Sequence, residues 1–208
     1  MILPFLSFGE QTMKKQSRIL NVRALTVTAV MSAMAYVLML LEFSVPLVPS
    51  FLKFDFSDLP AFLTSYAVSP AAGVTVELLK NLLHLPFTAT GGVGELANFL
   101  VGCAMVLPAG LVYRFRRTRS GAVLGAVAGA LLAGLVSFPV NYFITYPFYT
   151  NFMPMESILG MYQAILPAAN TLPRALLLVN LPFTVIKGGI NLLFTFLIYK
   201  PLSPLLKG

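Results

Sequence analysis

The sequence predicts an all-α integral membrane protein with six transmembrane helices. Three observations lead to this fold class: 58% of the 208 residues are hydrophobic, only 10% are charged, and several apolar runs approach the length needed to cross a bilayer. A soluble domain carries about 25% charged residues, so this composition excludes an ordinary soluble fold. We expect a single six-helix membrane domain over residues 21–208, preceded by a cytoplasmic segment of residues 1–20.

The net charge of +7 is concentrated in three places along the chain. The basic residues gather at Lys14–Arg23, at Arg114–Arg119 and at Lys200–Lys207. Basic residues beside apolar spans collect on the cytoplasmic side of a membrane. The distribution therefore predicts a multi-pass protein of the cell membrane with both termini in the cytoplasm, and it argues against a nucleic-acid-binding surface.

The first span is expected from about Val22 to Leu41. Ala29 and Ala33 lie four residues apart within it, so their small side chains form a shallow strip where another helix can approach closely. From the residues alone, this strip could serve packing inside the bundle or docking of an external partner.

A loop from Glu42 to about Phe56 follows, and the next two spans are short. Ser57 or Asp58 can cap the helix that starts after the loop. The second and third spans, about Asp58–Val68 and Ala71–Leu85, fall below the roughly 20 residues of a full crossing, so we expect them to be tilted or partly buried in the bundle.

The third span carries three polar side chains on one helical face, namely Glu77, Lys80 and His84. We expect Glu77 and Lys80 to form a structural ion pair. A metal site of Glu77, His84 and Glu95 is a weaker alternative, because the chain has one histidine and one cysteine and shows no ligand cluster. We expect neither a metal nor catalysis.

The fourth span, about Glu95–Tyr113, carries Asn98 one turn inside it. This amide could bind a ligand or another helix. The fifth span begins with small residues at four-residue spacing, which predicts close packing against a neighbouring helix; they are Gly121, Gly125, Gly129 and Ala133. At its far end, Asn141 starts a polar and aromatic stretch.

The last apolar run, Leu172–Ile198, has Lys187 near its centre. Asn180, Thr184 and Asn191 share its side of the helix. A charge at bilayer depth costs about 2.5–3.5 kcal/mol on insertion scales, so such a residue normally faces the protein interior and marks a site. We therefore favour a functional Lys187 over one that snorkels to the headgroups.

Four segments together carry a resemblance to a known family: FLKFDFSDLPAF, ELLKNLLHL, GELANFLVG and PFTVIKGGINLLF. Over about residues 20–200 the chain resembles the riboflavin-specific substrate-binding subunit (S component) of energy-coupling factor (ECF) vitamin transporters. The resemblance implies a six-helix S-component bundle in a bacterial cell membrane, which captures riboflavin from outside and releases it inward. It also implies a transmembrane coupling protein and two cytoplasmic ATPase subunits as partners, with riboflavin as transported ligand and no cofactor.

The resemblance further implies where the ligand and the coupling protein bind. It assigns the vitamin to the first outer loop and the outer halves of the last three helices; by position these residues are Leu47, Phe51, Asn98, Asn141, Thr184 and Lys187. It assigns the coupling protein to Ala29 and Ala33. An amide such as Asn141 can donate and accept hydrogen bonds at a pyrimidine edge, whereas Lys187 can only donate.

The chain contains no GxxxxGK[ST] phosphate loop, so it cannot drive ATP-dependent uptake alone. Two alternatives stay open at this point. One is an S component for another flat heterocyclic vitamin. The other is a membrane-embedded enzyme that uses Glu77, Lys80 and His84, although one histidine provides little acid–base chemistry.

Overall fold

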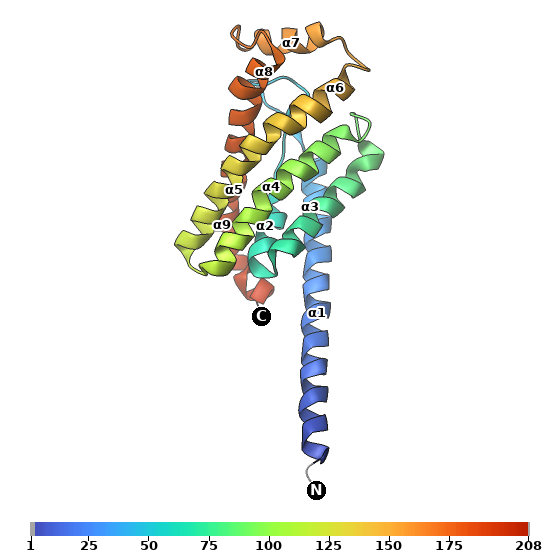
Figure 1. The fold of residues 1–208 in the computed structure, drawn as a ribbon, viewed down its shortest axis with the longest axis vertical. Coiled ribbons are helices and arrows are strands. Elements are labelled where there is room, and N and C mark those ends of the chain that lie inside the picture. The colour runs from blue at the N-terminus through green and yellow to red at the C-terminus, as the bar shows by residue number, and fades with distance from the viewer. Residues whose placement is uncertain (1–2, 208) are drawn as a thin grey trace.

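The fold is a bundle of helices with one short two-stranded hairpin (Figure 1). The computed structural model describes the backbone of residues 3–207 and the side chains of residues 22–198, so most side chains of the basic clusters at Lys14–Arg23 and Lys200–Lys207 lie outside the described residues. In chain order the elements are α1 (Leu3–Leu40), β1 (Phe43–Ser44), β2 (Lys53–Phe54), α2 (Asp58–Ala67), α3 (Pro70–His84), α4 (Val93–Phe115), α5 (Arg119–Val140), α6 (Tyr146–Tyr149), α7 (Met155–Gln163), α8 (Leu172–Ala175) and α9 (Leu181–Lys207).

Two wide π-helical turns join some of these helices into longer ones. Asn141–Thr145 connects α5 to α6, and Leu176–Asn180 connects α8 to α9. A proline follows each turn by two residues, Pro147 in one case and Pro182 in the other. Proline lacks a backbone N–H and its ring clashes with the carbonyl four residues earlier, so the helix widens before it. We infer that the prolines cause both turns.

Four of the described helices are long and apolar enough to cross a membrane. They cover Val22–Leu40, Val93–Phe115, Arg119–Tyr149 and Leu172–Ile198. Helices α2 and α3 have 10 and 15 residues, below the roughly 20 that a perpendicular crossing needs. The all-helical membrane fold is therefore supported, whereas the predicted count of six crossings is not confirmed.

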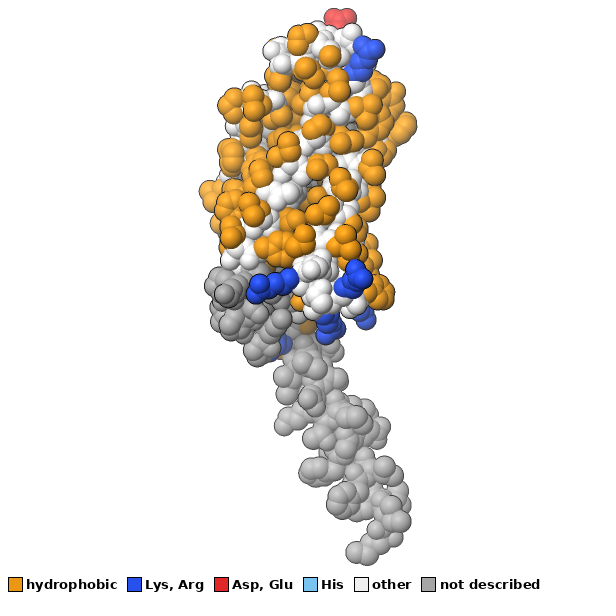
Figure 2. All heavy atoms as spheres, turned by 90° about the vertical axis from the view of Figure 1, so that its left-hand side faces the viewer, with side chains coloured by type: hydrophobic (Ala, Val, Ile, Leu, Met, Phe, Trp, Pro, Cys, Tyr) orange, Lys and Arg blue, Asp and Glu red, His pale blue; other side chains and the backbone are white. Residues whose placement is uncertain are grey.

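The surface of the bundle is largely apolar. Figure 2 shows hydrophobic side chains over most of one face, with most of the visible lysine and arginine side chains gathered near one end. The exposed arginines of the α4–α5 turn, within residues 114–119, belong to this end of the molecule, and Figure 1 places the start of α1 and the end of α9 toward the same end. The rest of this surface is suited to the hydrocarbon core of a membrane, because large exposed apolar areas are unfavourable in water.

Helix α2 lies at the centre of the bundle, in contact with α1, α3, α4 and α9. Nine of its ten residues are buried. Its predicted capping is wrong in one respect: the Ser57 side chain makes no cap hydrogen bond and instead accepts one from Lys80 Nζ at 2.9 Å. A central helix of this kind has no lipid-facing side, which explains why it can be short.

Helices α4 and α5 pack closely through the predicted row of small residues. A Cβ atom placed on Gly129 would lie 2.1 Å from the Met105 carbonyl oxygen, and one on Gly125 would lie 2.7 Å from that of Ala109. The small-residue prediction is confirmed, since only glycine permits this backbone approach.

Five charged side chains form a buried network beneath the hairpin. Lys187 Nζ on α9 lies 2.7 Å from Asp55 Oδ2. Lys80 Nζ on α3 lies 2.5 Å from Asp58 Oδ1 and 2.7 Å from Glu77 Oε2. Exposure of these five side chains ranges from 0% to 13%. Lys187 is thus paired inside the protein and does not snorkel, and Glu77 and Lys80 form the expected pair.

The Asp55 carboxyl belongs to the loop between α1 and α2. Burial raises the pKa of Asp55, but the positive charges of Lys187 and Lys80 outweigh burial and lower this pKa to about 2. A carboxyl with a depressed pKa contributes stability above its unfolded pKa of about 3.9 and loses that contribution as the pH falls through its folded pKa. Asp55 is therefore ionised at neutral pH and contributes its full stabilisation there.

We expect Asp55→Asn to destabilise the fold by about 3–5 kcal/mol, because Lys187 would keep a buried charge without its partner. The amide oxygen introduced by this change can still accept the hydrogen bond that Ser57 N donates to Asp55 Oδ1 at 2.8 Å. The double variant Asp55→Asn/Lys187→Met should recover most of the loss. Thermal unfolding of the purified chain in detergent measures both, with the exposed Lys53→Met as control. Equal loss in the single and double variants would show that the pair is not coupled.

Gly129→Ala should also destabilise the chain, by about 1–3 kcal/mol, because its methyl group would push α5 away from the α4 backbone. Gly189→Ala on α9 is the matched control. A Cβ atom on Gly189 would have no neighbouring atom within 4 Å. Because alanine has a higher helix propensity than glycine, this variant should be as stable as the unmodified chain or more stable. The same thermal measurement compares the two, and a similar response to both would contradict close α4–α5 packing as the cause.

Candidate ligand-binding cavity

A cavity of about 680 Å³ lies between the hairpin loop and the ends of α4, α5 and α9. This volume falls within the roughly 300–1,000 Å³ typical of small-molecule sites. Its walls come from the end of α1, the loop before α2, the α3–α4 connection, α4, the α5–α6 helix and the α8–α9 helix. A site assembled from elements so far apart in sequence depends on the whole bundle.

Apolar and aromatic side chains form part of the wall. Phe51 from the loop and Phe183 from α9 line the cavity, as do Met39 and Met105. Phe51 is held by edge-on ring contacts with tyrosines; the ring centroids lie 6.1 Å from Tyr146, 6.1 Å from Tyr149 and 5.8 Å from Tyr162. Such packing fixes the rings that could cover a flat ligand.

A hydrogen-bonded group behind Phe51 fixes Asn180. The Tyr162 hydroxyl donates to Asn180 Oδ1 at 2.5 Å, and Asn180 Nδ2 donates to the Tyr146 hydroxyl at 3.2 Å. The two tyrosine hydroxyls also contact each other. Burial raises the pKa of Tyr162, so its hydroxyl stays neutral and remains a donor. The sequence places Asn180 on the same side of its helix as Lys187. No sequence pattern predicts that the two tyrosines form hydrogen bonds with it.

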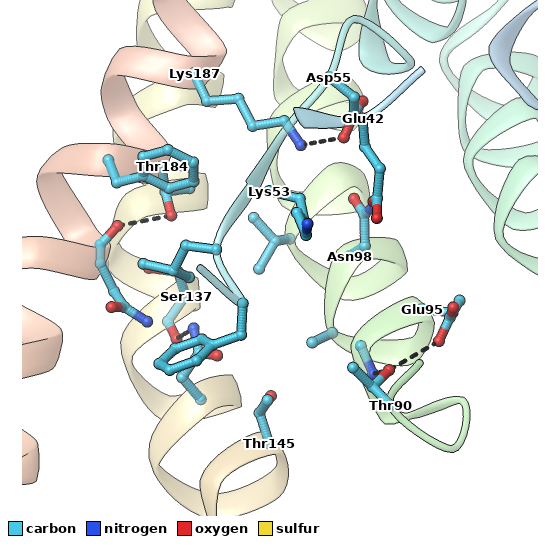
Figure 3. Close-up of a pocket in the computed structure, with 18 of the residues that line it drawn as sticks. Glu42, Lys53, Asp55, Thr90, Glu95, Asn98, Ser137, Thr145, Thr184 and Lys187 are labelled. Carbon is cyan, nitrogen blue, oxygen red and sulfur yellow. Dashed lines mark hydrogen bonds and ion pairs between the residues drawn. The ribbon is translucent and has the colours of Figure 1, made fainter. Parts of the chain in front are cut away.

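Polar side chains from α4 and from the α5–α6 helix face the same space (Figure 3). Asn98 is half-buried and makes no hydrogen bond with the described residues, which removes the helix–helix alternative for this amide. Asn141 donates from Nδ2 to the Ser137 carbonyl at 2.7 Å. The Thr145 hydroxyl, in a residue only 5% exposed, has no hydrogen-bond partner among the described residues. A buried hydroxyl without a partner indicates a place for a polar ligand atom.

The Lys187–Asp55 pair forms another part of the wall. Figure 3 shows the Lys187 ammonium reaching from α9 towards Asp55 in the loop. Thr184 lies one turn before Lys187 and donates its own hydroxyl hydrogen to the Asn180 carbonyl at 2.9 Å. Lys187 has three donor hydrogens, so it can hold Asp55 and still donate to a ligand oxygen.

A second charged group lies at the start of α4. His84 Nδ1 contacts Glu95 Oε1 at 2.9 Å, and Glu95 Oε2 accepts hydrogen bonds from the hydroxyls of Thr88 at 2.8 Å and Thr90 at 3.3 Å. Both His84 and Glu95 line the cavity and are buried. From the sequence, His84 is grouped with Glu95 only in the weaker metal alternative, and the structure shows that the two side chains contact each other directly.

Five of the six predicted ligand residues line this cavity, namely Phe51, Asn98, Asn141, Thr184 and Lys187. Leu47 does not. It is 76% exposed and lines a separate apolar groove beside α9. The predicted docking residues, Ala29 and Ala33, are both exposed on α1. Direct ligand contact by any of these residues stays a prediction.

The residues of the enzyme and metal alternatives come together only in pairs. Glu77 and Lys80 pair with each other away from the cavity wall, whereas His84 faces Glu95. Among the residues that the structure describes, no group of three or more His, Cys, Asp or Glu side chains could hold a metal ion.

Comparison with known proteins places this geometry in a family. The family model "ECF transporter, substrate-specific component" matches residues 23–199. The chain is 33% identical to the riboflavin transporter RibU of Staphylococcus aureus (strain TCH60), over 90% of this chain and 93% of that protein. It is 30% identical to the riboflavin transporter FmnP of Bacillus subtilis (strain 168), over 89% of this chain and 94% of that protein.

A solved structure agrees with these relatives. The fold matches that reported as "Structure and mechanism of the S component of a bacterial ECF transporter", with a TM-score of 0.72, 30% sequence identity, and coverage of 90% of this chain and 99% of that one. The family model, the relatives and the shared fold agree with the resemblance carried by the sequence segments. The chain belongs to the substrate-specific components of ECF transporters, a family of transport subunits.

Proposed function

We propose that this chain is the riboflavin-binding subunit of an ATP-driven ECF transporter in a bacterial cell membrane. The observation that carries the proposal is the cavity, which combines aromatic and methionine walls with a few fixed polar groups. The relatives named riboflavin transporters support the choice of vitamin. Another flat heterocycle would need similar walls, and the flavin absorption bands of the purified chain distinguish riboflavin from it.

The polar groups suit the two ends of riboflavin. The pyrimidine-dione edge needs donors and acceptors close together, which Asn141, Thr184 and Lys187 provide. The hydroxylated ribityl chain needs groups that both donate and accept, and Asn98 on α4 and Thr145 on the α5–α6 helix meet this need. Phe51 and Phe183 can cover the ring system between these ends.

We further propose a six-crossing arrangement in which α2 and α3 pass through the membrane inside the bundle. Both chain termini and the arginine-rich α4–α5 turn then lie in the cytoplasm, and the cavity opens to the outside. The loop of residues 42–56 covers the bound vitamin. Inward release requires a coupling membrane protein and two ATPase subunits, because this chain has no phosphate loop of its own.

The first test is the purified chain itself, which should carry flavin absorption bands. We expect Asp55→Asn/Lys187→Met to bind riboflavin about 10- to 100-fold more weakly than the unmodified chain, since a hydrogen bond to a charged donor is lost. Quenching of riboflavin fluorescence measures the affinity. This double variant is used because it leaves no unpaired charge at the site. Unchanged affinity in the folded variant would remove Lys187 from the ligand site, and a chain without riboflavin affinity would contradict the proposed function.

The second test concerns the Ala29/Ala33 strip, which we propose as the docking surface for the coupling protein. Ala29→Leu/Ala33→Leu should abolish riboflavin uptake by cells and co-purification of the coupling protein, because the added side chains hold a partner helix away. Riboflavin binding should stay within about twofold, since both residues are exposed and remote from the cavity wall. Met34→Leu, also exposed on α1, is the control. Lost binding with intact assembly would reverse the assignment.

A further inference from the structure

Helix N-termini are the usual protein sites for phosphate, because free backbone N–H groups and the helix dipole both attract anions. The N-terminus of the 23-residue helix α4 is part of the cavity wall, which includes Thr90, Gly94 and Glu95. An anion inside the cavity could therefore reach this helix end. The side chains around it decide whether it can bind there.

In this protein the helix end is already occupied by the chain's own oxygen atoms. Gly94 N donates to Thr90 Oγ1 at 3.0 Å, and Val93 N donates to the Thr90 carbonyl at 3.4 Å. Thr88 Oγ1 accepts from Gly92 N at 3.1 Å. The left-handed backbone of Gly92, at φ +86°, brings the turn back into this position. Three of the backbone N–H groups at this helix end therefore already have acceptors within the chain.

Glu95 adds a negative charge at the same place. It is 5% exposed, and His84, Thr88 and Thr90 hold both of its carboxylate oxygens. Asp55 and Asp58 also line the cavity, but their charges are paired with Lys187 and Lys80. Of the remaining ionisable wall residues, Glu42 and Glu95 are negative, Lys53 is positive, His84 contacts Glu95, and no arginine occurs in the described lining. A phosphate would thus meet a carboxylate in a poorly solvated space.

The Thr145 hydroxyl independently indicates what kind of group binds in this cavity. It is buried, has no partner among the described residues, and lines the same cavity as Thr90 and Glu95 (Figure 3). A hydroxyl both donates and accepts, which matches the alcohol groups of a polyol.

We propose that Glu95, fixed in the first turn of α4, makes this cavity select an uncharged hydroxylated ligand end over its phosphate ester. The proposal rests on riboflavin being the ligand and adds a specificity determinant to that site. Free riboflavin satisfies the site with neutral hydroxyls, whereas riboflavin 5′-phosphate brings a charge of about −1.5 to −2 towards the Glu95 carboxylate. Like charges in a poorly solvated site repel strongly, so the ester is rejected.

Three ligands test the proposal on the purified full-length chain: riboflavin, riboflavin 5′-phosphate and riboflavin 5′-acetate. Fluorescence quenching gives each dissociation constant. We expect the phosphate ester to bind at least about tenfold more weakly than the neutral acetate ester, because the two differ in charge more than in bulk. If both esters bind equally more weakly than riboflavin, the size of the added group and not its charge determines affinity. If the phosphate ester and riboflavin bind with equal affinity, the cavity does not discriminate against the phosphate. Either result overturns the proposal without any variant.

Glu95→Gln then tests the residue. It should narrow the ratio of phosphate-ester to riboflavin dissociation constants by about tenfold, whatever happens to the riboflavin affinity itself. Glu156→Gln, an exposed carboxylate on α7 outside the cavity wall, should leave the ratio unchanged. An unchanged ratio in Glu95→Gln overturns the role of Glu95. A chain that binds none of the three flavins contradicts the proposed function instead, so the two failures are distinguishable.

Discussion

Paired charges inside an apolar bundle are the constraint on which this structure depends. Lys187 and Lys80 lie where the surrounding surface is hydrophobic, and each reaches a carboxylate within 2.7 Å. Their partners, Asp55 and Asp58, flank the start of α2, so the two pairs fix the loop and the central helix against α3 and α9. Because an unpaired charge at this depth is costly, the pairing of all four side chains favours this arrangement of the bundle.

The cavity follows from irregularities in otherwise regular helices. The π-turns before Pro147 and Pro182 interrupt the ordinary helical repeat where Asn141, Thr145 and Asn180 meet the cavity. A regular helix would orient these side chains differently. Polar groups are thereby fixed before a ligand arrives, which lowers the entropy lost on binding.

Much of the fold could be predicted from local sequence. Apolar runs, the glycine row of α5 and the short second and third helices follow from composition and spacing, and the predicted start of α3 differs by one residue. The depth of Lys187 indicated an interior site, but its partner could not be found, since Asp55 lies 132 residues earlier and no local pattern joins them. The π-turns were missed because periodicity arguments assume 3.6 residues per turn. Leu47 was assigned to the ligand from its place in the loop, yet the hairpin turns this residue outward.

The separation between Asp55 and Lys187 has a consequence for biogenesis. A ribosome synthesises Asp55 long before Lys187, so the nascent chain enters the membrane before the Lys187 counter-ion of this loop exists. The loop can settle only when the last helix arrives and supplies the ammonium group. A chain interrupted before α9 would therefore keep Asp55 without the lysine that pairs with it in the complete bundle.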